Sequence, residues 1–524
     1  MSQYHPREVE MKLSLGPADL ADMRRHIAAE LGHAGITSRL VSVYYDTPDY
    51  ELRAQGVTLR VRSAHDRKVQ TTKLAGQAAV GLFSRGEWET PLDGDVPDLK
   101  AFARTPAGDI IDAKRIRVEA LFETIVDRTL WMVEHQGTLI EIALDDGKVV
   151  TATRTEPLAE LELELKRGSP RELFALARKL NPRGLLHPGV RAKSEVGYRL
   201  LSGKAAKPVK ADPVVLDKHM TSAAAFQAVM HATLRHFCLN EPVVISHRTP
   251  ESLHQARVAL RRMRSALSLF KDFTRDGQLP ELKRRLQIVS RDLGEARNLD
   301  VYIAHSVRPL VERNGGETGL KALLTELEAR RAKAFDLAVT QLRSEDFGKL
   351  LLDLLEWIEA GPWLSDEDPA RKAARERPVR ALAAAVLEKQ RRKVKRAGRN
   401  LDEIDPAARH RVRIEAKKLR YAAEFFTSLA RKGKAKERHL AFVAALEKLQ
   451  EHLGDLNDIH TGHEIVLRLA ETAPLGTPPS REAVGAAAHV SALEHARVED
   501  RIAAAAEAYT AFAQARRFWS KWPA

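Results

Sequence analysis

The segment "PREVEMKLSL", residues 6–15, decides the fold of the N-terminal part of this 524-residue chain. Apolar residues alternate in it with polar ones, which is the period of a strand with one apolar face. An ordinary strand would turn its polar face to water. Here that face carries two glutamates and a lysine in register. The alternative is that it faces charged ligands. The polar positions are Glu8, Glu10, Lys12 and Ser14.

Further strands with one charged face follow, in short runs bounded by Gly, Pro or Asp up to about residue 200, and they predict a sheet or a barrel. Surface charges usually mix signs, whereas here carboxylates cluster on the first and last strands and basic groups on the middle ones. This segregation favours a closed barrel with its charged faces turned into the lumen. The positions are Arg60, Arg62, Lys73, Arg85, Glu87, Glu89, Glu141, Glu160, Glu162, Glu164 and Lys166.

A charged lumen is unstable without counter-ions, because close like charges repel and desolvated charges need partners. Multivalent cations beside the glutamates and a polyphosphate beside the basic groups would satisfy both sets. Oxygen ligands of this kind favour Mg²⁺ or Mn²⁺ over zinc.

Composition limits the class of protein. The length predicts two or three domains. The single cysteine, Cys238, excludes an intramolecular disulfide and a Cys-rich zinc site. No apolar run approaches a membrane span, and the N-terminus has no signal-peptide character. We therefore expect a cytoplasmic protein without a membrane partner.

The formal net charge of +14 belongs mostly to the C-terminal part, since residues 221–524 hold 52 Lys+Arg against 40 Asp+Glu. Residues 1–220 hold 33 against 31. The excess should attract a polyanion: nucleic acid, polyphosphate or an anionic membrane surface.

From about residue 221 the chain changes to long amphipathic helical runs that repeat. "HQARVALRRMRSALSLF" (254–270) aligns with "HRVRIEAKKLRYAAEFF" (410–426), and "LGEARNLD" (293–300) with "LGDLNDIH" (453–460). The constant order and offset predict a duplicated, pseudo-twofold all-α domain. Each half has one basic stripe at offsets 0, 3, 7 and 10, which share a helix face. These stripes are His254, Arg257, Arg261 and Arg264, and His410, Arg413, Lys417 and Arg420.

The N-terminal 200 residues resemble the CYTH superfamily, the triphosphate tunnel metalloenzymes. "EVEMK" looks like the ExExK motif of that family, and "LRVR", "QTTKLAG", "SRGEWE", "IEIALDDG", "ELELELK" and "KSEVGYRL" resemble its later motifs in order. The resemblance implies an α+β domain built on an eight-stranded antiparallel barrel that hydrolyses triphosphates with Mg²⁺ or Mn²⁺.

The same resemblance implies roles for individual residues. Glu8 and Glu10 would bind metal with two of Glu160, Glu162 and Glu164, the triplet leaving the register open. Glu141 and Asp145 would hold a second metal or its water. The phosphate-binding set would be Lys12, Arg60, Arg62, Lys73, Arg85, Arg128 and Lys193.

The helical part resembles the CHAD domain on the strength of both His-x-x-Arg helices and both "LG" segments. This resemblance implies two pseudo-symmetric four-helix bundles with a basic groove for inorganic polyphosphate. In the first half Asn298 stands where the family pattern has Asp. Nucleic acid is the second choice of ligand, because the basic stripes lack interleaved aromatic residues for base stacking.

Together these features predict a CYTH tunnel domain at 1–203, a linker at 204–220 and a CHAD domain at 221–519. The expected function is metal-dependent hydrolysis of inorganic triphosphate beside a polyphosphate-binding module, with association to polyphosphate granules. The alternatives are an adenylate cyclase or a thiamine triphosphatase of the same family, or a non-catalytic polyphosphate-binding protein.

Overall fold

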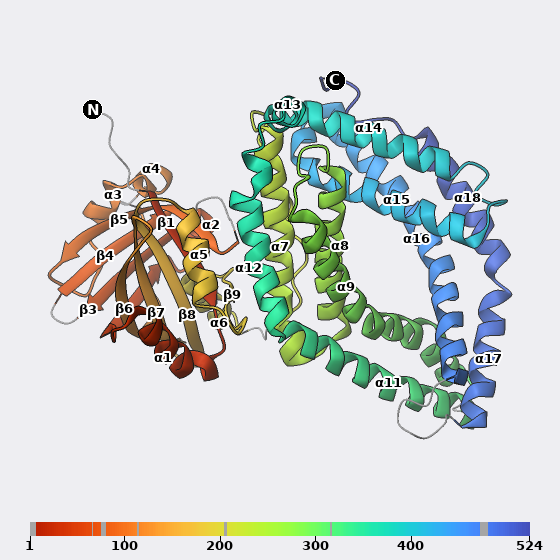
Figure 1. Ribbon diagram of the computed structural model, residues 1–524, viewed down its shortest axis with the longest axis horizontal. Coiled ribbons are helices and arrows are strands. Elements are labelled where there is room, and N and C mark those ends of the chain that lie inside the picture. Colours follow the sequence, from red (N-terminus) through yellow and green to blue (C-terminus); the bar gives the residue numbers. More distant parts are fainter. Residues whose placement is uncertain are drawn as a thin grey trace. The chain divides into compact units, whose positions relative to one another are not determined.

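The structure is a computed structural model that describes residues 7–64, 67–74, 80–112, 115–203, 207–314, 317–471 and 480–523. The side chains of residues 7, 8, 83–85, 470 and 471 lie outside the description. The chain forms two compact units, one of Met1–Lys207 with Arg343–Ala360, the other of Pro208–Leu342 with Gly361–Ala524. Figure 1 shows strands in the first and helices alone in the second.

The first unit contains a closed antiparallel sheet, so the predicted barrel is confirmed. The strand order is β5-β4-β3-β2-β6-β7-β8-β1-β9, and β1 also pairs with β5, which closes the ring. The strands are β1 (Arg7–Ser14), β2 (Ile36–Asp46), β3 (Val57–Ala64), β4 (Arg67–Leu74), β5 (Leu82–Leu92), β6 (Glu119–His135), β7 (Thr138–Val150), β8 (Thr155–Arg167) and the short β9 (His187–Pro188).

The register of β1 against β8 separates its two faces. Met11 lies opposite Leu163 and Leu13 opposite Leu161, and all four are fully buried in the apolar layer. The alternate positions place Lys12 opposite Glu162, and both line a cavity in the barrel. The polar face of the first strand therefore turns inward, as the sequence predicts.

Short helices and two longer ones accompany the barrel. They are η1 (Pro17–Asp19), α1 (Leu20–Leu31), α2 (Glu51–Ala54), α3 (Leu99–Ala103), α4 (Ala107–Ile110), α5 (Arg171–Lys179), α6 (Lys193–Leu201) and α12 (Glu345–Ala360). Helix α6 packs against β6 and β7, where a β-carbon on Gly197 would lie 2.1 Å from Phe122 Cε2. Only glycine allows this approach, and it brings the first residue of α6, Lys193, into the barrel.

The unit to which helix α12 belongs differs from the predicted domain division, which places residues 343–360 in the helical domain. The structure groups them with the barrel because α12 packs against α5 and β9. Glu356 of α12 forms an ion pair with Arg178 of α5, and the Phe347 ring lies edge-on to His187 of β9 at 5.9 Å between centroids.

The second unit is helical in its described residues. Its elements are α7 (Ser222–His247), α8 (Pro250–Leu269), α9 (Leu279–Tyr302), η2 (Ile303–Val307), α10 (Arg308–Arg313), α11 (Thr318–Leu342), η3 (Pro362–Leu364), α13 (Pro369–Glu376), α14 (Val379–Ala397), α15 (Pro406–Phe425), η4 (Thr427–Ala430), α16 (Gly433–Glu471), α17 (Arg481–His495) and α18 (Val498–Gln514).

The predicted duplication is visible in helices α8 and α15. Each has 20 residues and starts with proline at the offset of 156 that the sequence alignment gives. Each is capped by a side-chain oxygen, from Thr249 in α8 and from Asp405 in α15, that accepts from a backbone N–H three residues on. Helix α8 packs between α7 and α9 while α15 packs between α14 and α16, and α8 contacts α15.

Candidate functional site

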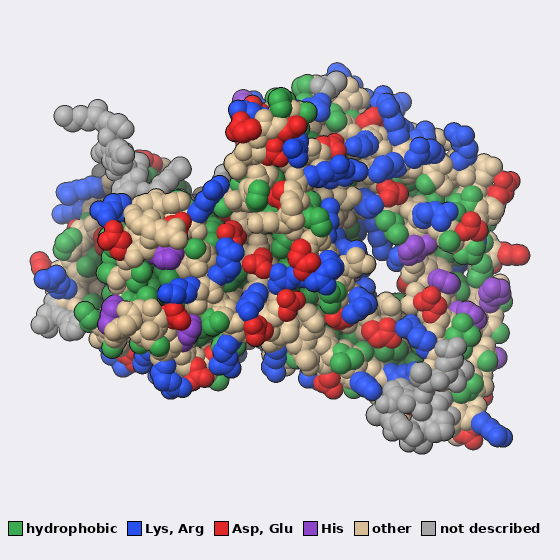
Figure 2. All heavy atoms as spheres, in the orientation of Figure 1, with side chains coloured by type: hydrophobic (Ala, Val, Ile, Leu, Met, Phe, Trp, Pro, Cys, Tyr) green, Lys and Arg blue, Asp and Glu red, His purple; other side chains and the backbone are tan. Residues whose placement is uncertain are grey.

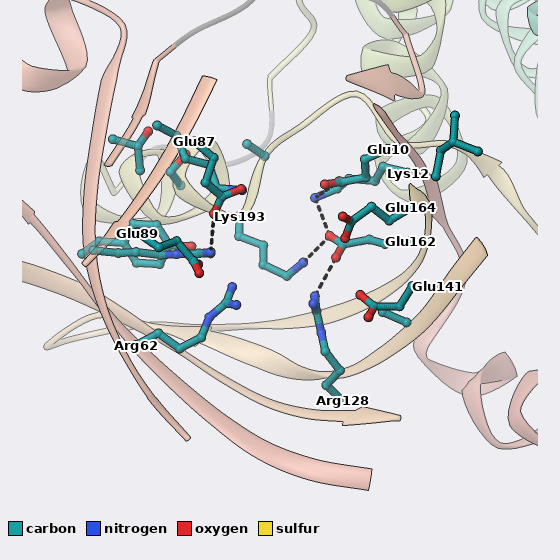
Figure 3. Close-up of a pocket in the computed structure, with 18 of the residues that line it drawn as sticks. Glu10, Lys12, Arg62, Glu87, Glu89, Arg128, Glu141, Glu162, Glu164 and Lys193 are labelled. Atoms are coloured by element: carbon teal, nitrogen blue, oxygen red, sulfur yellow. Dashed lines mark hydrogen bonds and ion pairs between the residues drawn. The ribbon is translucent and has the colours of Figure 1, made fainter. Parts of the chain in front are cut away.

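A cavity of about 620 Å³ lies inside the barrel and collects the charged faces of its strands (Figure 3). Carboxylates and basic groups from strands far apart in the sequence meet in it, together with the start of α6. The charged side chains that line it are Glu10, Lys12, Arg60, Arg62, Lys73, Glu87, Glu89, Arg128, Glu141, Glu162, Glu164, Lys166 and Lys193.

Three carboxylates form an inner acidic triad, defined as Asp145, Glu160 and Glu162, with one ligand oxygen each within 4.8 Å of the others. The Lys193 ammonium lies 2.8 Å from Asp145, 2.7 Å from Glu160 and 2.8 Å from Glu162. A single buried cation therefore already sits between the three acids.

Two more cations complete the neutralisation of the triad. Lys12 lies 2.9 Å from Glu162 and 3.3 Å from Glu160. Arg128 donates through Nε and Nη2 to the two Asp145 oxygens, both at 2.7 Å, and through Nη2 to Glu162 at 2.6 Å. Three carboxylates thus face three cations.

The pKa values of these groups follow from the pairing. Burial alone would raise the pKa of Glu162, but Lys12, Lys193 and Arg128 hold it well below its ordinary value. Burial would likewise lower the pKa of Lys193, yet Asp145, Glu160 and Glu162 raise it well above its usual range. Glu162 and Lys193 are therefore charged at neutral pH.

An outer carboxylate row lies beside the triad and consists of Glu10, Glu141 and Glu164. Glu164 of β8 is the register partner of both Glu10 in β1 and Glu141 in β7, so the three acids are neighbours across adjacent strands. Lys166 contacts Glu164 at 2.6 Å and Glu141 at 3.4 Å, and Glu10 lies 3.9 Å from Lys12. Because Lys12 also forms ion pairs with Glu160 and Glu162 of the inner triad, it neutralises the outer row only in part, and this row retains an excess of negative charge.

The wall formed by β3, β4 and β5 carries the opposite excess. Glu87 binds Lys73 at 2.6 Å and Arg60 at 3.6 Å, while Glu89 accepts from Thr71. Arg62 has no carboxylate partner among the described residues. Its neighbour Arg60, then burial and Arg128, lower the pKa of Arg62 to about 10.

Most sequence-predicted residues of the barrel are thus brought together in one cavity. Asp145 and Glu160 are within the network but are not among the residues lining the cavity. The side chains of Glu8 and Arg85 lie outside the described residues, although their backbones pair with each other. Tyr44, which lines the cavity opposite Arg60 in the β2–β3 ladder, was missed, and the alternation of polar residues in β2 is the signal that could have found it.

The helical unit has a basic stripe that joins its two halves. Figure 2 shows Lys and Arg side chains gathered over α14 and the helices beside it. Within the stripe, Arg261 of α8 acts electrostatically on both Arg413 and Lys417 of α15. The two sequence repeats therefore place their cations against each other.

These cations repel one another in a partly buried site. Burial, then Arg413 and Arg261, lower the pKa of Lys417 to about 6. Burial, with Arg297 and Arg261, lowers the pKa of His254 to about 4. Asp458 acts in the opposite direction on Arg413 and Lys417, and a further anion near them would raise their pKa values again.

Four members of the predicted stripes deviate from this arrangement. Arg420 pairs with Glu424 at 2.7 Å, so an acid four residues on in the same helix neutralises it. Arg257 donates to the Ser290 carbonyl at 2.8 Å, while His410 and Arg264 are exposed.

His410 lies 2.8 Å from Asn457 Oδ1. Arg297 of α9 faces the first stripe and was missed. It lies in the repeated "LG" segment, at the position that aligns with Asn457.

Two domain families match separate parts of the chain. The CYTH domain family matches residues 6–195, and the CHAD domain family matches residues 228–467. None of the described helices combines the length and apolar character that crossing a bilayer requires.

Two relatives illustrate these matches. An inorganic triphosphatase from Haemophilus influenzae is 30% identical over 203 residues, which are 37% of this chain and 55% of that protein. The chain thus matches only about half the length of this relative. The crystal structure of the CHAD domain from the plant Ricinus communis is 27% identical, with a TM-score of 0.51, and covers 60% of this chain and 98% of that one. The chain therefore contains a CYTH domain followed by a CHAD domain.

Proposed function

We propose that the barrel hydrolyses inorganic triphosphate to diphosphate and phosphate. The observation that carries this proposal is the separation of charge across one cavity: an outer carboxylate row in excess on one side and Arg60, Arg62 and Lys73 on the other. A metal–triphosphate complex presents cation and anion on opposite sides in the same way. Phosphoryl transfer asks a protein mainly for positioning and charge neutralisation.

The residues present fit Mg²⁺ or Mn²⁺. Hard carboxylate oxygens are the donors these ions prefer, and the outer row needs additional positive charge. Glu10 and Glu164 would be metal ligands with Glu8, and Glu162 would be the second β8 ligand in preference to Glu160 because Glu162 lines the cavity and Glu160 does not. Glu141 completes the row. When bound, the metal would lower the pKa of a water and polarise phosphate oxygens.

The other side chains of the cavity would act on the phosphates directly. Arg62 has a guanidinium with Nε buried and without a hydrogen-bond partner, which a phosphate oxygen would provide. Arg60 and Lys73 would bind neighbouring oxygens and release part of their hold on Glu87. Lys12, Arg128 and Lys193 form ion pairs with the inner triad, and they would add positive charge behind the bound phosphates.

The choice of inorganic triphosphate is supported by the Haemophilus influenzae inorganic triphosphatase relative. Most residues that line the cavity are charged, and among the described ones Tyr44 alone carries an aromatic ring, so an adenine or thiazolium ring would find little apolar surface there. Adenylate cyclase and thiamine triphosphatase activities remain the alternatives that the assay below distinguishes.

We further propose that the helical unit binds inorganic polyphosphate along the stripe joining α8 and α15. The support is the mutual repulsion among Arg261, Arg413 and Lys417, which a linear polyanion would neutralise. Single-stranded nucleic acid is the second candidate, and localisation at polyphosphate granules would follow from the first.

The test is phosphate release from inorganic triphosphate, long-chain polyphosphate, ATP and thiamine triphosphate, each with Mg²⁺ or Mn²⁺. We expect inorganic triphosphate to have the highest kcat/KM. Glu10→Gln should abolish turnover while the unfolding midpoint stays near that of the wild type. Cyclic AMP formed from ATP, or no turnover of any triphosphate, would overturn the proposal, the second outcome favouring a binding protein.

A further inference from the structure

The backbone of Lys12 lies where the pairings of β1 with β5 and with β9 meet. Its N–H donates to the Gly81 carbonyl at 2.7 Å, and its own carbonyl accepts from Gly189 at 2.8 Å. Gly81 donates in turn to the Gly189 carbonyl at 3.1 Å. Two glycines on separate segments thus hold the backbone of Lys12, which is one of the three cations that pair with the inner triad.

Helix α12 packs against one of these two glycines, Gly81. Gly81 has a left-handed φ of +67°, and a β-carbon placed on it would lie 2.9 Å from Leu355 Cδ2 and 3.1 Å from Pro188 Cβ. Leu355 is fully buried, and α12 also packs on β9, which pairs with Leu13 and Ser14 just after Lys12. The Leu355 side chain therefore lies against Gly81, whose carbonyl accepts from the Lys12 N–H.

The position of α12 in the chain is unusual. It belongs to the barrel unit but follows α11 of the helical unit after only two residues, Arg343 and Ser344. The chain leaves the helical unit for this one helix and then returns to it at Gly361. Helix α12 is therefore joined to the helical unit at both of its ends.

We propose that Leu355 of α12 is a positioning residue for triphosphate hydrolysis, because it packs against the glycine that hydrogen-bonds the Lys12 backbone. The inference rests on the proposed function, because it assigns Leu355 a role in that reaction. It acts through Gly81 and the Lys12 backbone and touches no substrate. A shift of Lys12 would move Glu162 and Glu160, which it binds at 2.9 and 3.3 Å.

The test compares two leucines of α12 in the full-length protein. Leu355→Ala removes the contact with Gly81, whereas Leu350→Ala makes the same truncation at an equally buried position. The second site lies five residues earlier, about 140° away around the helix at about 100° per residue. Since misplacement by about 1 Å can cost about a hundredfold in rate, we expect L355A to lower kcat by about tenfold or more. Leucine 350 serves as the control for general loss of packing.

Three readouts separate positioning from stability. L355A and L350A should lower the unfolding midpoint by similar amounts, but only L355A should lower kcat and raise the Mn²⁺ concentration for half-maximal activity. Leu355→Met, which refills most of the volume, should restore kcat. Equal kcat losses in both alanine variants, or none in L355A, would overturn the inference. Absence of triphosphate turnover in the wild type would instead overturn the proposed function.

Discussion

Lys193 Nζ lies 2.8 Å from Glu162 Oε1, although one residue begins a helix and the other lies in a strand 31 positions earlier. The same ammonium contacts Asp145 and Glu160. One lysine at the start of α6 therefore neutralises carboxylates from two strands, and the stability of the barrel should depend on it.

Replacing this lysine by an uncharged side chain of similar length should be strongly destabilising. Lys193→Met leaves the inner triad with two cations for three buried carboxylates, and removing one partner from a buried ion pair costs about 3–5 kcal/mol. Chemical denaturation of the full-length protein would measure the loss. Lys179→Met is the control, since Lys179 pairs with Glu30 at a half-exposed surface and should change stability by less than about 1 kcal/mol. Equal stabilities of the two variants would contradict the structural role of Lys193.

The approach of α6 to the barrel should depend on the absence of a side chain at Gly197. A methyl group there would lie 2.1 Å from Phe122 Cε2, so Gly197→Ala must displace the helix that carries Lys193. Overpacking of this kind costs about 1–3 kcal/mol, and triphosphatase activity should fall with it. Gly485→Ala in α17 is a matched control, because nothing lies within 4 Å of its β-carbon position and alanine favours a helix by about 1 kcal/mol. A stable, fully active G197A would show that α6 does not need this contact.

The strands of the barrel were predictable because their polar and apolar faces differ so strongly. Glu8, Glu10 and Lys12 alternate with Val9 and Met11, and this period alone indicates which face is inside once the charges are compared between strands. The stripes of α8 and α15 were predictable for a related reason, since identical spacing recurs at one offset.

Long-range pairings within the site were not predictable. The spacing of Glu160, Glu162 and Glu164 is uniform, so only the register against β1 and the position of Lys193 separate the inner triad from the outer row. Helix α12 is amphipathic like the helices next to it in the chain, so its own sequence does not indicate that it packs on β9 and α5 of the barrel unit. Arg297 was missed because it lies outside the two basic stripes of the sequence, and the residue that aligns with it in the other repeat, Asn457, is uncharged.

The β8 glutamates should therefore divide into a structural and a metal-binding residue. Glu164→Gln removes charge from the outer row and should raise the Mn²⁺ concentration for half-maximal activity by about tenfold or more. This is the effect expected from losing a ligand that contributes about 1.4 kcal/mol to the free energy of metal binding. Glu160→Gln should instead lower the unfolding midpoint, because Lys12 and Lys193 lose a partner. Metal titrations and thermal unfolding of both variants provide the comparison. If E160Q shifts the metal requirement and E164Q does not, the assignment is wrong.

Binding of polyphosphate to the helical unit should be accompanied by uptake of a proton. Burial, Arg413 and Arg261 lower the pKa of Lys417 to about 6, so its side chain is mostly neutral at pH 8. A bound polyanion favours the charged form and raises this pKa. The affinity should therefore fall as the pH rises from about 6 toward the ordinary lysine value of about 10.4. Calorimetry at pH 8 in two buffers of different ionisation enthalpy measures the number of protons taken up.

Two arginine substitutions provide the matched comparison for this proton. Lys417→Arg keeps a group that stays charged, so it should bind polyphosphate with less proton uptake and a weaker pH dependence. Lys418→Arg changes the adjacent lysine, whose ammonium lies 2.8 Å from Glu415, and should behave as the wild type. Proton uptake that persists unchanged in K417R would assign it to another group, of which His254 is the first to substitute because burial and Arg297 lower its pKa to about 4.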